Sequence, residues 1–187
     1  MNGIELIAGA IATVKSTENS AADTKEAIVP GDGNAPVLGN FGNGLAVVYL
    51  VDEGDKLTYI QNRDLVAAGV TPADLHQRGM MNLANKASNG LRLMENGDIH
   101  ALLLDGHFEA SLVLLDDLWD SALASYAPNG FIVALPARDV IAFCDAKSEA
   151  GIAQLHDMVS RITAKGDHLV SRSLYQRQAG AWHRLPG

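Results

Sequence analysis

The sequence is poor in cysteine, in positive charge and in long apolar runs, and each shortage excludes a class of protein. Its one cysteine, Cys144, leaves no partner for a disulfide within the 187-residue chain. The disulfide framework of a small secreted domain is therefore excluded. Cys144 lies in an apolar run, which is typical of a buried and inert thiol. Because an unpaired cysteine fits a reducing compartment, we expect a cytoplasmic protein.

Positive charge is scarce, with 14 Lys and Arg against 22 Asp and Glu, and the net charge is −8. Binding of nucleic acid depends on clustered Lys and Arg that neutralise phosphates, so we expect no nucleic-acid partner. An acidic chain is suited to a basic protein partner, although the same charge also serves solubility. A basic protein is therefore one expected partner.

No run approaches the roughly 20 apolar residues of a membrane-spanning helix, so we expect no membrane association. Residues 4–14 are apolar apart from Glu5, but no Lys or Arg precedes them as in a secretory signal. We expect instead a short helix over residues 4–15. That helix would dock on the rest of the chain or on a second copy, which makes a homodimer one alternative.

The sequence motifs of common enzyme classes are also missing. There is no Gly-x-Ser-x-Gly nucleophile turn, no paired Cys and His, and no dinucleotide fingerprint. The Gly-rich run at residues 31–34 lacks the Lys-Ser/Thr of a phosphate loop. We interpret residues 1–43 as an N-terminal helix with a Gly/Ser/Asn-rich connection, and we expect no cofactor.

Residues 44–187 alternate between strand pairs and helices, as expected for a single α+β domain. Asn96-Gly97, between two apolar runs, is a strong hairpin signal. Ser148 and Gly166 bound a helix with apolar residues at helical spacing. The pattern predicts antiparallel hairpins alternating with helices that pack on the sheet. Further strands are expected at 45–51, 56–61, 169–176 and 181–185, and further helices at 62–68 and 71–86.

The most apolar stretch lies between His107 and Asp145. From Ser111 the spacing of Leu112, Leu115 and Trp119 predicts a helix, with Asp116, Asp117 and Asp120 on its polar side. Strands are expected at 131–135 and 140–144, separated by Pro136, which lacks the amide that a sheet requires.

Two segments of this stretch carry a family resemblance. The run from Glu109 to Trp119 (EASLVLLDDLW), followed by Pro136-Ala-Arg-Asp139 before an apolar strand, resembles the YtpQ-like family of uncharacterised bacterial proteins. The match extends over about residues 36–185, and it includes the runs 45–52, 62–65, 74–76 and 174–177. The resemblance implies a bacterial protein with this type of fold, and it brings no established activity.

Three alternating polar residues form the first candidate site. If the strand from Asp98 continues, Asp105, His107 and Glu109 point one way and supply ligands for a divalent metal or a general base. The simpler interpretation is that Asp105-Gly106 is a turn with His107 exposed beside it.

Arg138 and Asp139 form the second candidate site, in a tight connection beside an apolar core. The planar guanidinium of Arg138 is suited to clamp a carboxylate or phosphate. The simpler interpretation is an ion pair that fixes the loop. Tyr175 and Trp182 are either an exposed aromatic surface for a partner or a packed pair within the last hairpin.

These observations favour a non-catalytic protein-binding module, for example one that neutralises a basic, toxin-type enzyme. The alternative is a hydrolase- or transferase-like enzyme. That alternative requires its polar residues to converge on one cleft: Asp105, His107, Glu109, Arg138 and Asp139.

Overall fold

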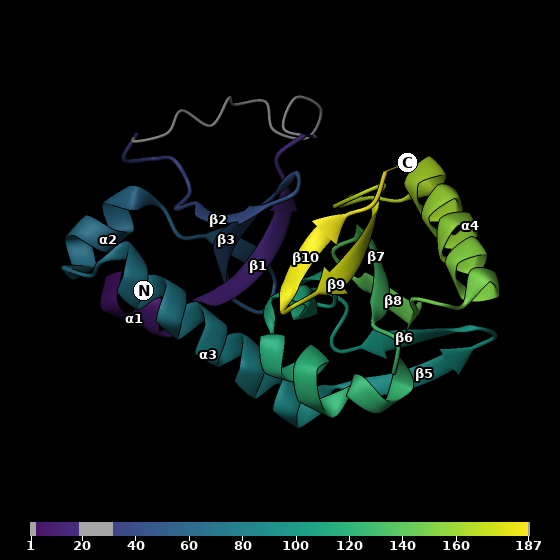
Figure 1. Ribbon diagram of the computed structural model, residues 1–187. Helices are drawn as coiled ribbons and strands as arrows, with labels where there is room; N and C mark the ends of the chain where they lie inside the picture. Colours follow the sequence, from purple (N-terminus) through teal and green to yellow (C-terminus); the bar gives the residue numbers. More distant parts are fainter. Residues whose placement is uncertain (1–2, 19–31, 187) are drawn as a thin grey trace. The chain divides into compact units, whose positions relative to one another are not determined.

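The computed structural model describes residues 3–18 and 32–186 of the chain (Figure 1). They belong to two compact units, Met1–Lys86 and Ala87–Gly187. Helices and antiparallel sheets build both units, so the expected α+β class is confirmed. The units do not follow the expected division between residues 43 and 44, because strands on either side of that point pair in one sheet. Residues 19–31 of the expected connection lie outside the described residues.

The sheet of the N-terminal unit is built around β3 (Leu45–Asp52), which is almost entirely buried. It pairs antiparallel with β1 (Ile11–Ser16), β2 (Gly39–Gly42) and β4 (Leu57–Tyr59). The expected helix over residues 4–15 is therefore wrong in its second half, since α1 covers only Gly3–Ala8. A short apolar run is ambiguous between helix and strand, and pairing with β3 decides the outcome here.

Two predicted helices follow and are confirmed. The first, α2 (Asn62–Ala68), ends at Gly69, whose φ of 65° is the left-handed conformation that glycine adopts readily. The second, α3 (Pro72–Gly90), turns Gly79 toward the sheet. A Cβ at Gly79 would lie 3.0 Å from the ring of Tyr49, so only glycine allows this close approach.

The C-terminal unit contains a six-stranded antiparallel sheet in the order β10-β9-β7-β8-β6-β5. The hairpin expected around Asn96-Gly97 is present, but Asn96 pairs with Ile99, so Gly97 and Asp98 form the turn. The strands are β5 (Arg92–Asn96), β6 (Ile99–Leu103), β7 (Phe131–Ala137), β8 (Val140–Asp145), β9 (Leu174–Gln178) and β10 (Ala181–Arg184).

One face of this sheet is covered by α4 (Glu149–Lys165) (Figure 1). The helix begins as predicted, because the hydroxyl of Ser148 accepts a hydrogen bond of 3.0 Å from the amide of Gly151. Its apolar side packs into a core made of Ile99, Ile132, Ala134, Ala142, Cys144, Leu155, Val159 and Leu174.

The opposite face is covered by residues 110–126, which do not form the continuous helix expected there. They are divided into a 3-10 turn (Ala110–Leu114), a π-helix (Leu118–Ala122) and a second 3-10 turn (Ala124–Tyr126). The first turn is buried on every side, so it lacks the polar face of an amphipathic helix. Trp119 is fully buried, and its ring packs edge-on against Phe131 at 5.2 Å.

Strand β7 also departs from expectation, because it continues through Pro136 to Ala137. The missing amide of Pro136 is accommodated by an irregular register between Ala134 and Ala137. The carbonyl of Pro136 still accepts a hydrogen bond of 2.9 Å from the amide of Val170. The turn at residues 138–139 is therefore fixed to the segment that follows α4.

Candidate functional site

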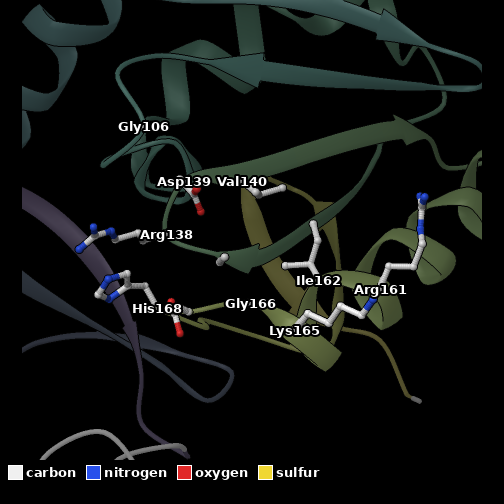
Figure 2. Close-up of a pocket in the computed structure, with 11 residues that line it drawn as sticks. Gly106, Arg138, Asp139, Val140, Arg161, Ile162, Lys165, Gly166 and His168 are labelled. Atoms are coloured by element: carbon white, nitrogen blue, oxygen red, sulfur yellow. The ribbon is translucent and has the colours of Figure 1, made fainter.

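A depression of about 470 Å³ lies in the C-terminal unit, where the turn between β7 and β8 approaches the end of α4 (Figure 2). The turn, the loop after β6 and the segment after α4 all contribute side chains or backbone. The residues that line it are Gly106, Ala137, Arg138, Asp139, Val140, Arg161, Ile162, Lys165, Gly166, Asp167 and His168.

Arg138 is held in this depression by its own backbone. Its amide donates to the carbonyl of His168 at 3.1 Å, and its carbonyl accepts from the amide of Ala110 at 3.0 Å. A residue with both backbone groups bonded to separate segments has little freedom to move its Cα. The guanidinium therefore extends from a rigid base, which is the arrangement that a binding residue needs.

His168 stands beside Arg138 in an uncommon backbone conformation. Its φ is 53°, in the left-handed region that residues other than glycine adopt infrequently. The bond between its carbonyl and Arg138 and the bridge between Leu169 and Ala137 hold the segment there. Residues kept in such conformations are more frequent at functional sites than elsewhere.

The last turns of α4 supply two more cations. Arg161 and Lys165 are four residues apart, so they lie on the same side of the helix, and both are exposed. Cations near a helix C-terminus also complement its dipole, which is a purely structural reason for their position. In Figure 2, Arg138 and His168 lie on one side of the depression. Arg161 and Lys165 lie on the other side.

The loop after β6 does not assemble the first candidate site. Strand β6 ends at Leu103, so Asp105, His107 and Glu109 do not share one face of a strand. Glu109 is only 3% exposed, and its Oε1 accepts from the amides of Leu104 at 2.9 Å and Gly106 at 2.7 Å. Within the described part of the chain, no three His, Cys, Asp or Glu side chains are placed to hold a metal ion.

The convergence that an enzyme would require is therefore only partial. Arg138 and Asp139 line the depression, as does Gly106. Glu109 is turned toward the backbone of its own loop, where it shapes the rim at Gly106. The carboxylate of Asp105 accepts from the amide of His107 at 3.1 Å, a local turn contact.

Tyr175 and Trp182 do not form an exposed aromatic surface, because both are buried. The Tyr175 hydroxyl is 2.7 Å from that of Ser171, and the Trp182 indole donates to the carbonyl of Val113 at 3.0 Å. Both residues therefore belong to the core. These aromatic residues therefore do not support a protein partner. A basic protein partner stays a prediction that is based on the net charge alone.

A second polar cluster surrounds Arg177, whose side chain is 4% exposed. Its Nε and Nη2 each donate to the Asp120 carboxylate at 2.7 Å, and Nη2 also donates to Asp116 at 2.9 Å. The guanidinium lies over the ring of Trp182, 5.1 Å from the centroid. The hydrogen bonds from Arg177 lower the pKa of Asp120 below its ordinary value. This cluster joins the π-helix to β9.

Of the residues that line the depression, the sequence predicted Arg138 and Asp139 as candidates. It did not identify Arg161, Lys165 and His168. These three come from the end of α4 and the segment after it, more than 20 positions further along the chain. The available signal was the Gly-Asp-His run at residues 166–168, directly after the predicted helix end. A polar run at a helix end is common, so it does not identify a site without the fold.

Comparisons of the chain with protein-family models, with curated proteins and with solved structures find no match. Membership of the YtpQ-like family therefore stays a prediction. In residues 3–18 and 32–186, no helix is long and apolar enough to span a membrane.

Proposed function

We propose that this protein acts by non-covalent binding of an anionic ligand, carrying a carboxylate or a phosphate, in the depression beside Arg138. The observation that supports it most is that three permanent cations, Arg138, Arg161 and Lys165, line one depression in a chain of net charge −8. The lining contains only two carboxylates, Asp139 and Asp167, so the depression has an excess of positive charge. A bound anion would offset that excess.

Arg138 is the principal binding residue of this proposal. Its guanidinium presents several N–H groups in a plane and pairs with a carboxylate or phosphate through two parallel bonds. Because its backbone is anchored on both sides, binding has to order only the side chain of Arg138 and not its backbone. Arg161 and Lys165 are exposed and Arg138 is only partly buried, so we expect a dissociation constant on the order of 1 mM for a simple anion.

The test is isothermal titration of the full chain with inorganic phosphate and with acetate at low ionic strength. We expect saturable binding that weakens as NaCl is added, because salt screens exposed charges. Arg138→Gln should weaken binding about 10-fold, since it removes a charge-assisted contact. Arg92→Gln changes an exposed arginine on β5 outside the depression and is the matched control.

Two results would contradict the proposal. One is the absence of saturable binding of either anion. The other is equal weakening by Arg138→Gln and Arg92→Gln, which would show only a response to net charge. In that case the cations at the end of α4 would serve the helix dipole alone.

A further inference from the structure

The cations of the depression are divided into two groups that belong to different elements. Arg138 is in the turn between β7 and β8, and the carbonyl of His168 binds its amide. Arg161 and Lys165 are on α4, four residues apart on the same side of the helix. Figure 2 shows the two groups on opposite sides. The depression therefore presents its positive charge at two places, one on each side.

The surface between these groups is aliphatic. Val140 and Ile162 line the depression, and both are only partly buried, so their side chains remain accessible. In Figure 2 their side chains lie between Arg138 and Arg161. A methylene chain in contact with this surface would bury apolar area, and that burial would stabilise the bound ligand. A hydrated polar linker would gain nothing there.

Two carboxylates restrict the charge that the depression accepts. Asp139 and Asp167 are both exposed in its lining, where the Arg and Lys side chains exceed them by one. A ligand with several adjacent negative charges, such as a polyphosphate, would bring some of them close to these carboxylates. Repulsion from these two carboxylates therefore weakens the binding of such a ligand, while attraction to the cations still favours anions.

We infer that the ligand carries two separated anionic groups joined by a short aliphatic chain, as in a dicarboxylate. This inference rests on the proposed function, since it assigns a ligand class to the same depression. One carboxylate pairs with Arg138, and the other pairs with Arg161 and Lys165. The methylene chain lies over Val140 and Ile162.

The experiment is titration of the full chain with malonate, glutarate and pimelate, which differ only in the length of the chain between carboxylates. Monomethyl glutarate keeps the chain of glutarate and lacks one charge, and it is the matched ligand. We expect one length to bind best and monomethyl glutarate to bind about 10-fold more weakly than glutarate, as for a lost charge-assisted contact. Inorganic tripolyphosphate should bind more weakly than the best dicarboxylate.

Two variants test which cations bind each end of the ligand. Arg138→Gln, and separately the double variant Arg161→Gln with Lys165→Gln, should each reduce glutarate affinity to that of monomethyl glutarate for the unaltered protein. Circular dichroism checks that each variant is folded, and all three positions are accessible enough to tolerate glutamine.

The outcomes separate this inference from the proposed function. If monomethyl glutarate and glutarate bind equally while Arg138→Gln weakens both, the site takes one anionic group, and only the present inference is overturned. If tripolyphosphate binds more tightly than every dicarboxylate, the ligand class is also wrong. If no anion binds, the proposed function fails as well.

Discussion

Asp120→Ala should destabilise the C-terminal unit by about 2–3 kcal/mol. The substitution removes two charge-assisted hydrogen bonds of 2.7 Å and leaves Arg177 with Asp116 as its carboxylate partner. Arg177 is 4% exposed, so its charge cannot regain water without moving. The side chain of Asp120 is 52% exposed, and that exposure keeps the cost below the full value for a buried pair.

Matched variants test whether the loss of stability comes from the buried charge of Arg177, which no longer has Asp120 as a partner. Asp117→Ala, three positions away and exposed, should change stability by less than about 0.5 kcal/mol. Arg177→Met removes the buried charge but keeps a long side chain over Trp182, and two exposed carboxylates remain in water. Since replacing a buried ion pair with apolar groups is often nearly neutral, Arg177→Met should cost less than Asp120→Ala.

The assay is urea unfolding followed by tryptophan fluorescence. The two tryptophans, Trp119 and Trp182, both belong to the C-terminal unit, so fluorescence reports this unit alone. A loss of 2–3 kcal/mol lowers the urea midpoint by about 1–2 M. If Asp117→Ala lowers it as much as Asp120→Ala, or if Arg177→Met is the most damaging variant, the reasoning is refuted.

The ion pair between Arg177 and Asp120 also makes the stability of the C-terminal unit depend on pH. Arg177 lowers the Asp120 pKa in the folded protein, so the stabilisation is fully present above the unfolded value of about 3.9. It is lost as pH falls through the lower, folded pKa. The difference between the unaltered protein and Asp120→Ala should therefore be constant from about pH 5 to pH 8 and shrink below about pH 4. A difference that persists unchanged in acid would contradict the ion pair.

Two further predictions concern the core and the helix cap. Burial raises the pKa of the Cys144 thiol to about 11, so a thiol reagent at pH 8 should modify it only after denaturation; fast labelling of the native protein would contradict its burial. Ser148→Ala should cost about 1 kcal/mol, measured by the same urea assay, because it removes the hydroxyl that accepts from Gly151. Ser148→Asp retains an acceptor and should recover most of that loss.

Local signals predicted the elements whose contacts are local. The helix α4 follows from apolar spacing and from the cap at Ser148, which act within a few residues. The hairpin at residues 92–103 follows from Asn96-Gly97, although its register depends on pairing across both strands. These features persist because packing reinforces what the local sequence already prefers.

Nonlocal contacts decided the elements that were predicted incorrectly. Residues 11–16 form a strand because they pair with β3, whose residues lie between 29 and 39 positions further along the chain than their partners. Residues 110–126 break into short turns, where Trp119 is buried against Phe131 and Asp120 is held by Arg177 from 57 positions away. The depression depends on the same kind of contact, since His168 reaches Arg138 only in the folded chain.

The central claim is that an anion binds beside Arg138, and the most direct measurement is mapping by NMR. The full chain, labelled with nitrogen-15, is titrated with glutarate, and the shift of every backbone amide is followed. The account predicts saturable shifts concentrated at Gly106, Arg138, Gly166 and His168, which line the depression. Shifts spread evenly over exposed Lys and Arg, or confined to the N-terminal unit, would contradict it.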